Sequence, residues 1–196
     1  MILSARYGAV AASLPAGGGV AGPFDLLTPG SVASSGGSIS INPNGSVSFT
    51  GVNDVRIRTV FNETYTNYRI VMNATRATDD YCTLRLTNGT TLNTSSFTRQ
   101  LYRNDNGTAQ GNRDTSTSGI FSYMNGLFGV TADVFAPMLA EYTGIRTNTA
   151  VRKSGYVIND FNTMMMTTTE TWDGFIIGNM IGGVTGTIAV YGWGSS

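Results

Sequence analysis

The stretch Phe61-Asn-Glu-Thr-Tyr-Thr-Asn-Tyr-Arg-Ile-Val-Met72 decides the fold. It opens with a turn rich in Asn and Thr and continues as an alternating run. Tyr68, Ile70 and Met72 point to one side of that run, and the residues between them point to the other. Side chains on a strand alternate between its two faces. The run therefore predicts a strand over residues 67–73 with one buried face.

The same alternation recurs on both sides of this stretch. Residues 38–50 predict a hairpin, because the turn cluster Asn42-Pro-Asn-Gly45 separates two alternating runs and Gly45 can adopt a positive φ. Residues 104–118 predict a polar loop that is long for a compact domain. About ten short strands separated by turn signals favour an all-β fold. Further strands are expected at residues 55–61, 82–87, 97–103, 120–124, 134–139, 156–158, 164–169, 175–177 and 187–191, with one more around Val151.

The composition narrows the class of protein. The chain of 196 residues has 12 basic and 12 acidic side chains, one cysteine and no histidine. Nucleic-acid binding favours a basic excess, which is absent from the sequence. A Ser-His-Asp site, a zinc site with His ligands and an intramolecular disulfide are likewise excluded. We expect no cofactor and no metal, and the apolar runs are too short for membrane insertion.

Residues 1–37 differ from the rest of the chain. They are rich in Gly, Ala, Ser and Pro, a composition typical of a flexible tail. The sequence therefore predicts an extended arm at 1–37 and a β-sandwich domain at 38–196. Apolar side chains within the arm predict that it docks on a partner chain, either in a groove or as a strand added to a sheet edge. These candidate docking residues are Ile2, Leu3, Tyr7, Phe24, Leu26 and Leu27.

No motif in the sequence specifies a reaction. Gly17–Gly22 matches the dinucleotide pattern G-x-G-x-x-G, but prolines at 15 and 23 replace the strand and helix that this pattern needs. Glu170 and Asp173 flank Trp172, as the carboxylates of a glycosidase flank an aromatic platform, yet their separation is not readable from sequence. Scattered surface charge is the simpler interpretation. We expect no enzymatic activity.

Two features leave alternatives open. Met164-Met-Met166 fits either a core strand or an adaptable subunit contact. Exposed aromatics can stack on sugar rings while nearby polar groups bind the hydroxyls. The candidate glycan contacts are Tyr102, Tyr123, Trp172 and Asp173.

Several short motifs occur in a familiar order. Phe61, Tyr65-x-Asn67-Tyr68-Arg69-Ile70, Leu84-Arg-Leu-x-Asn-Gly-Thr90, Asp173-Gly-Phe175 and Gly186-Thr-Ile-Ala-Val-Tyr-Gly192 follow one another along the chain. In this the chain resembles small β-sandwich modules of tailed-bacteriophage structural proteins, found in head decorations and in tail-fibre or receptor-binding proteins. The resemblance covers residues 38–193, and no shaft repeats of a long fibre are present.

The resemblance implies a jelly-roll-like antiparallel sandwich displayed on a virion. It implies homo-oligomerisation, with a trimer as the expected state, and other capsid or tail proteins as partners. The leading hypothesis is a capsid decoration or a short tail or fibre adaptor anchored through the arm. The alternative is a carbohydrate-binding module that recognises a host receptor. A hydrolase is the third hypothesis.

Overall fold

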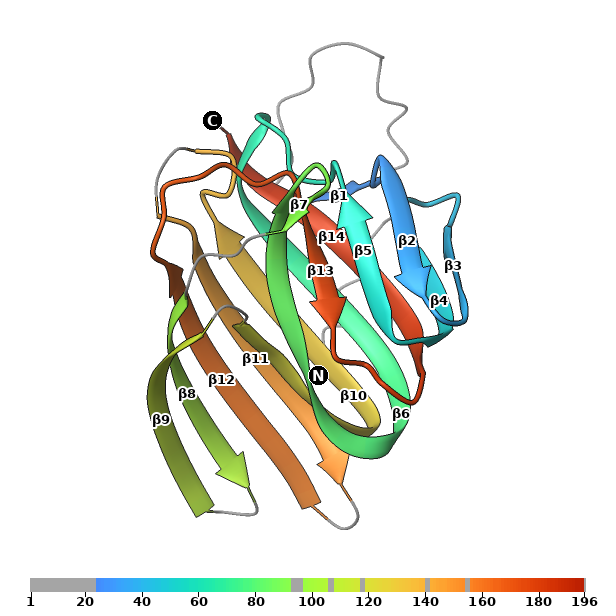
Figure 1. Cartoon of the computed structure of the whole chain (residues 1–196), viewed down its shortest axis with the longest axis vertical. Helices are drawn as coiled ribbons and strands as arrows, with labels where there is room; N and C mark the ends of the chain where they lie inside the picture. The colour runs from blue at the N-terminus through green and yellow to red at the C-terminus, as the bar shows by residue number, and fades with distance from the viewer. Residues whose placement is uncertain are drawn as a thin grey trace, which may run out of the picture.

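The computed structural model describes residues 24–92, 97–105, 108–116, 119–139, 142–153 and 156–195, and these residues form strands and turns without a helix (Figure 1). The predicted all-β, antiparallel sandwich is confirmed. Among the described residues no helix could span a membrane. The strands are β1 (Asp25–Leu27), β2 (Ser31–Ser35), β3 (Ser38–Ile41), β4 (Val47–Val52), β5 (Asp54–Arg58), β6 (Tyr65–Asn88), β7 (Thr91–Leu92), β8 (Phe97–Asp105), β9 (Thr108–Ser116), β10 (Gly119–Phe135), β11 (Gly144–Lys153), β12 (Tyr156–Met166), β13 (Gly174–Gly178) and β14 (Val184–Ser195).

The long strand β6 joins the two layers of the sandwich. Its first half, up to Arg76, pairs with β14 on one side and β10 on the other. Its second half, from Asp80 on, pairs with β10 and with β13. Two register shifts in β10, one of them beside Gly126, accompany the bend. Bulges of this kind bend a strand and raise its twist. The paired strands β6 and β10 can therefore continue from one sheet into the other.

The larger sheet curls into a half-barrel, and the smaller sheet packs against part of it (Figure 1). From β14 the larger sheet runs through β6, β10, β11, β12 and β8 to β9, with β1 and β4 on the outer edge of β14. The smaller sheet consists of β2, β5, β13 and the second half of β6, with the short β7 beyond. All pairings among the described strands are antiparallel.

The core between the layers contains the predicted buried face. Tyr68, Ile70 and Met72 are fully buried, and Phe61 packs on the rings of Tyr68 and Phe175 at centroid distances of 4.6 and 5.8 Å. The Tyr68 hydroxyl accepts a hydrogen bond from the Asn62 backbone N–H, and its one proton has the carbonyls of Asn62 and Tyr65 as acceptors within reach. These bonds tie the opening turn to the strand that follows it. Burial raises the pKa of Tyr68.

A charged pair lies inside the half-barrel. Arg103 on β8 and Asp160 on β12 are directly opposite each other. Two parallel bonds of 2.8 Å join the Arg103 Nε and Nη2 atoms to the Asp160 carboxylate. The Asp160 side chain is 0% exposed and the Arg103 side chain 10%. Tyr81 completes the cluster, since its hydroxyl accepts a hydrogen bond from Arg103 Nη1 and its ring lies under the guanidinium.

Some strand predictions were wrong in extent. The loop predicted at residues 104–118 is wrong for its described part, because β8 continues to Asp105 and Thr108–Ser116 form β9, paired with β8 along its whole length. The segments predicted at 67–73 and 82–87 are one strand, β6, and those at 120–124 and 134–139 share β10, which ends at Phe135. The 38–50 hairpin is confirmed, with Gly45 at φ 90°.

The described part of the predicted arm belongs to the sheets. β1 pairs with β14, and β2 pairs with β5 over five residues. Within the described part of the chain, regular structure therefore begins at Asp25, thirteen residues before the predicted start of the domain at Ser38. Residues 1–23 lie outside the described residues, as does the Gly17–Gly22 motif.

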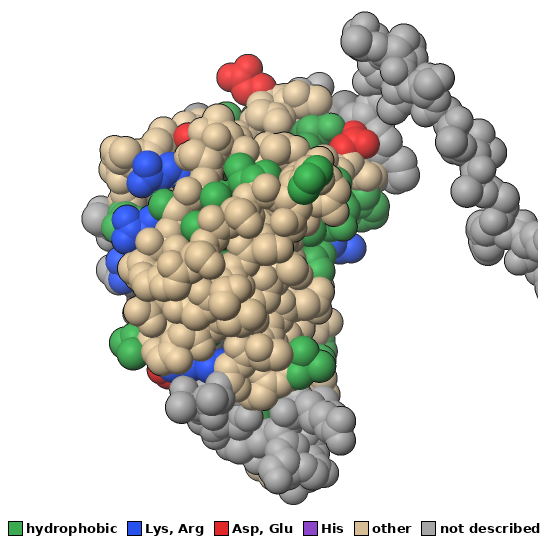
Figure 2. Space-filling view, turned by 90° about the vertical axis from the view of Figure 1, so that its right-hand side faces the viewer, with side chains coloured by type: hydrophobic (Ala, Val, Ile, Leu, Met, Phe, Trp, Pro, Cys, Tyr) green, Lys and Arg blue, Asp and Glu red, His purple; other side chains and the backbone are tan. Residues whose placement is uncertain are grey.

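Charged and hydrophobic side chains are scattered on the face seen in Figure 2. Most of the atoms shown there belong to the backbone or to uncharged polar side chains, with hydrophobic, basic and acidic groups between them. This agrees with a chain in which only 12% of the residues are charged. Thr and Ser suit such half-exposed strands, because their short side chains fit the pleated surface and lose little conformational entropy.

Candidate binding faces

The structure separates the four predicted glycan contacts. Tyr102 lies on the outer side of β8 and is 47% exposed. Trp172 is only 2% exposed, so its predicted stacking on a sugar is wrong. Tyr123 is part of β10, and its side chain lies outside the described residues. Asp173 accepts a hydrogen bond from the Gly89 N–H, and its backbone carbonyl accepts two more from residues 60 and 61, which makes it a junction between turns.

Tyr102 has an aromatic neighbour that the sequence did not reveal. Phe161 stands directly opposite it on β12, is 46% exposed, and has its ring centroid 6.4 Å from that of Tyr102. Asn148 on β11 and Thr131 on β10 continue the same row across the sheet. We call Tyr102, Phe161, Asn148, Thr131 and Arg146 the aromatic face.

Arg146 borders a shallow hollow on this face. The hollow has a volume of about 380 Å³ and is shared by Arg146, Asn148, Thr131 and Phe161. The Arg146 guanidinium lies 5.9 Å from the ring centre of Phe135 and makes no ion pair within the described part of the chain. The face thus offers an aromatic surface, an amide and a cation side by side.

The end of the predicted arm reaches the same side of the larger sheet. Phe24 is 49% exposed and packs on Trp193 of β14, with ring centroids 5.5 Å apart. Arg69 of β6 lies over both rings, at 5.2 and 5.6 Å. We call Phe24, Trp193 and Arg69 the arm patch. Residues 1–23, with Ile2, Leu3 and Tyr7, join the domain here but lie outside the described residues.

The other two predicted docking residues differ from each other. Leu26 is 36% exposed, whereas Leu27 is partly buried against the core. Asp133 holds Arg69 in place through bonds of 2.6 and 3.0 Å to Nε and Nη2. This bidentate bond raises the pKa of Arg69. The arm patch is therefore a fixed cation between two rings, beside apolar groups that face outward.

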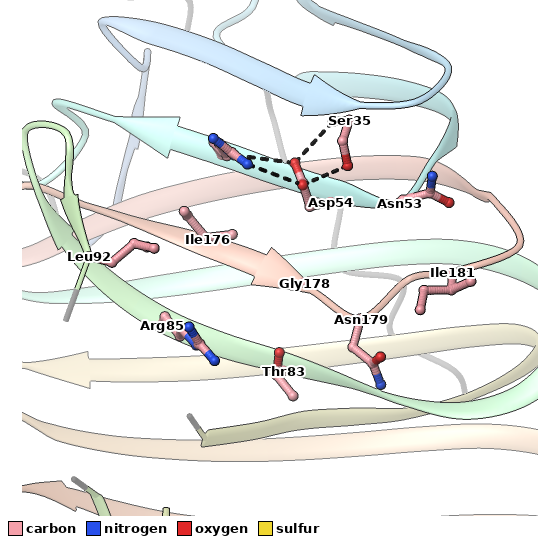
Figure 3. A pocket seen from close by; sticks show the side chains of 11 residues that line it. Ser35, Asn53, Asp54, Thr83, Arg85, Leu92, Ile176, Gly178, Asn179 and Ile181 are labelled. Carbon is pink, nitrogen blue, oxygen red and sulfur yellow. Dashed lines mark hydrogen bonds and ion pairs between the residues drawn. The ribbon is translucent and has the colours of Figure 1, made fainter. Parts of the chain in front are cut away.

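A second hollow lies on the outer face of the smaller sheet (Figure 3). Arg56 on β5 and Arg85 on β6 are both directly opposite Ile176, the central residue of β13. The next outward positions on β13 are Gly174 and Gly178, which present no side chain. We call this feature the arginine hollow; its volume is about 550 Å³. Its remaining lining residues are Ser35, Asn53, Asp54, Thr83, Leu92, Asn179 and Ile181.

The two arginines of this hollow are held differently. Asp54 accepts hydrogen bonds from the Ser35 hydroxyl at 2.6 Å and from Arg56 Nη2 at 3.4 Å. Arg56 Nε is buried and lies 3.4 Å from Asp54 Oδ1, an ion-pair contact, but it makes no hydrogen bond to any described residue. Arg85 makes no ion pair or hydrogen bond with any described residue, and no dashed line reaches it in Figure 3. The hollow therefore keeps one cation unbalanced.

The methionine triplet lies partly in the core and partly at the surface. Met164 and Met166 are buried in the core, and Met165 between them is 48% exposed on the outer face.

The described residues hold no group of three side chains suited to a metal ion. A scan against protein-family models gave no match, and a search of curated proteins gave none either.

Proposed function

We propose that this chain is a non-enzymatic structural protein of a bacteriophage virion, displayed on the particle surface and anchored through its N-terminal segment. The bacteriophage assignment rests on the resemblance of the short motifs between Phe61 and Gly192. Its partners would be capsid or tail proteins and further copies of this chain, with a trimer as the expected oligomer.

One structural observation carries the assembly part of the proposal. At residues 160–162 of β12 the usual polarity is reversed, since Asp160 and Asn162 face inward while Phe161 faces outward. Phe161 and, further along the same outer face, Met165 stay about half exposed. Exposed apolar groups gathered on one face are typical of an interaction surface. An outer face of this kind suits a protein that is covered by neighbours in an assembly.

The arm patch supports anchoring at the N-terminal end. Phe24 and Leu26 present apolar surface next to the position where residues 1–23 join the sheet. β1 is a three-residue edge strand that pairs with β14, and such edges can accept further strands. A docked segment leaving from this edge would bring the arm patch against the partner.

Deletion of residues 2–23 tests the anchoring. All described contacts remain in this variant, so we expect unchanged circular dichroism and thermal unfolding. In a phage complementation experiment we expect the truncated protein to be missing from purified particles. Tyr142→Ser, at a side chain 61% exposed and outside the arm patch, is the control and should be incorporated. Normal incorporation of the truncated chain would refute the proposal.

Carbohydrate recognition by the aromatic face is a second candidate function. The observation that favours it is the exposed pair of Tyr102 and Phe161 beside Asn148 and Arg146. Aromatic rings provide a platform for sugar rings, and amide and guanidinium groups bind hydroxyls.

A glycan array probed with the assembled protein tests this function. We expect binding that Phe161→Ala and Tyr102→Ala each abolish, and that Tyr142→Ala leaves intact. An array without binding by the assembled wild-type protein would remove the second candidate and leave the structural role untouched.

A further inference from the structure

We propose that the arginine hollow is a binding site for an acidic monosaccharide, a sugar unit that carries one carboxylate. The site lies on the smaller sheet, away from the aromatic face and the arm patch. It does not depend on the virion role, so particle incorporation and sugar binding can fail separately.

The net positive charge of the hollow favours binding of a single anion. Two guanidinium groups and one carboxylate line it, which leaves one positive charge without a partner. Asp54 holds Arg56 by its Nε and Nη2 side at 3.4 Å, and Arg56 retains unused N–H donors. Arginine presents donors in a fork that matches a carboxylate, and such charge-assisted bonds are stronger than neutral ones.

The register places both cations around one point. Arg56 and Arg85 flank Ile176 on the two neighbouring strands, so their Cα atoms are about 10 Å apart, or two strand spacings. Both side chains are long enough to reach a carboxylate that lies over Ile176. Asp54 orients Arg56, whereas Arg85 is free to turn toward the ligand.

The glycines of β13 create the space for the ligand. A Cβ at Gly174 would lie 2.3 Å from the Ile57 carbonyl oxygen, so glycine is required there by the backbone. At Gly178 a Cβ would meet only the Thr83 hydroxyl, at 3.5 Å, which is an ordinary contact. The backbone would thus tolerate a side chain at position 178, and glycine there leaves the base of the hollow open.

The other lining groups match the body of a sugar. Ser35, Asn53, Thr83 and Asn179 bring hydroxyl and amide groups to the rim, and Figure 3 shows them along both sides of β13. Leu92, Ile176 and Ile181 supply apolar contacts for ring carbons, and Leu92 and Ile181 are 39% and 67% exposed. A volume of about 550 Å³ is sufficient for one sugar unit with its first neighbours.

The test compares glucuronate with glucose, which differ only in the carboxylate at C6, and with acetate, which lacks the sugar. Each is titrated into the ¹⁵N-labelled full chain and followed by backbone amide shifts. We expect glucuronate to shift the amides of Ile176, Gly178 and Arg85 with a millimolar Kd, and glucose and acetate to bind at least about tenfold more weakly.

Three variants locate the site. Arg85→Gln should weaken glucuronate binding about tenfold, because a charge-assisted contact is lost. Gly178→Ala should weaken it severalfold by filling the base of the hollow, and it serves as a second test if Arg85→Gln fails to fold. Arg58→Gln is the matched control, since Arg58 also lies on β5 but does not line the hollow.

The proposal is overturned if glucuronate shifts none of these amides, or if glucose or acetate binds as tightly. Undiminished binding by Arg85→Gln would refute the role of the unpaired cation. Equal loss in Arg58→Gln would show that general surface charge, rather than the hollow, attracts the anion.

Discussion

Replacing Asp160 with Asn should strongly destabilise the fold. The Asp160 side chain is fully buried and binds Arg103 through two bonds of 2.8 Å. The Arg103 side chain is itself only 10% exposed, and its bond to Asp160 raises its pKa, so it stays charged. The substitution Asp160→Asn would leave that charge buried without a carboxylate. Loss of one partner of a buried pair costs about 3–5 kcal/mol.

Urea unfolding followed by circular dichroism measures this cost. Small domains show a free energy of unfolding of about 5–15 kcal/mol and a urea slope of about 1–3 kcal/mol per molar. A loss of about 4 kcal/mol then lowers the midpoint by about 2 M at the middle of that range. The slope itself should not change.

Asp133→Asn is the matched control for this experiment. Asp133 also binds an arginine on the neighbouring strand, at 2.6 Å, but the side chains of Arg69 and Asp133 are 37% and 18% exposed. Half-exposed pairs contribute about 0–1 kcal/mol. Equal losses in Asp133→Asn and Asp160→Asn, or a loss below about 1 kcal/mol in the latter, would contradict the reasoning.

Two further predictions concern alkaline pH and strand packing. Burial is the main cause that raises the pKa of Tyr65 to about 12, above the usual value of about 10, and a 2.7 Å hydrogen bond to Asp25 adds to it. The neutral phenol is therefore favoured in the folded state. Its contribution to the free energy of unfolding is fully present below pH 10 and is lost between pH 10 and 12. Ultraviolet titration should show the late ionisation, and Tyr65→Phe should flatten the fall in stability; a normal ionisation would contradict this. Gly186→Ala places a Cβ 2.3 Å from the Asn73 carbonyl oxygen and should cost at least about 2 kcal/mol in thermal unfolding. Gly178→Ala meets no such obstacle and should unfold near the wild-type temperature, and equal Tm values would refute the distinction.

Alternation of apolar residues allowed the central strand to be predicted. Tyr68, Ile70 and Met72 are large side chains separated by single polar or smaller residues. A period of two places all three on one face of a β-strand. The turn at Asn42–Gly45 was predictable for a local reason, since its glycine takes a positive φ that other residues avoid.

The strand at Thr108–Ser116 carries no such signal. It contains Thr, Gln, Asn, Arg, Asp, Gly and Ser with a single Ala, and it is held in the sheet by backbone pairing with β8. Strand propensity depends strongly on neighbouring strands. A polar edge strand and a polar loop therefore have the same composition, and only the partner strand distinguishes them.

The candidate sites were predictable only in part, because exposure depends on the other sheet. Tyr102 was identified from its residue type, but so was Trp172, which the fold buries. Phe161 was missed because it lies between Asp160 and Asn162, a sequence that suggests a polar segment. Arg85 and Arg56 are far apart in sequence and come together only through the register of β13.

The reversed polarity of β12 has an energetic explanation that favours assembly. Inside the half-barrel Asp160 is paired with Arg103, and the Asn162 Nδ2 group donates to the Thr147 hydroxyl at 3.0 Å, although Asn162 Oδ1 has no partner among the described residues. The aromatic ring of Phe161 then has only the outer face available. Covering a side chain of this size contributes about 1.5–3 kcal/mol when it passes from full exposure to full burial. Phe161 starts about half exposed, so a partner that covers it together with Tyr102 gains part of that energy from each ring while the polar interior remains undisturbed.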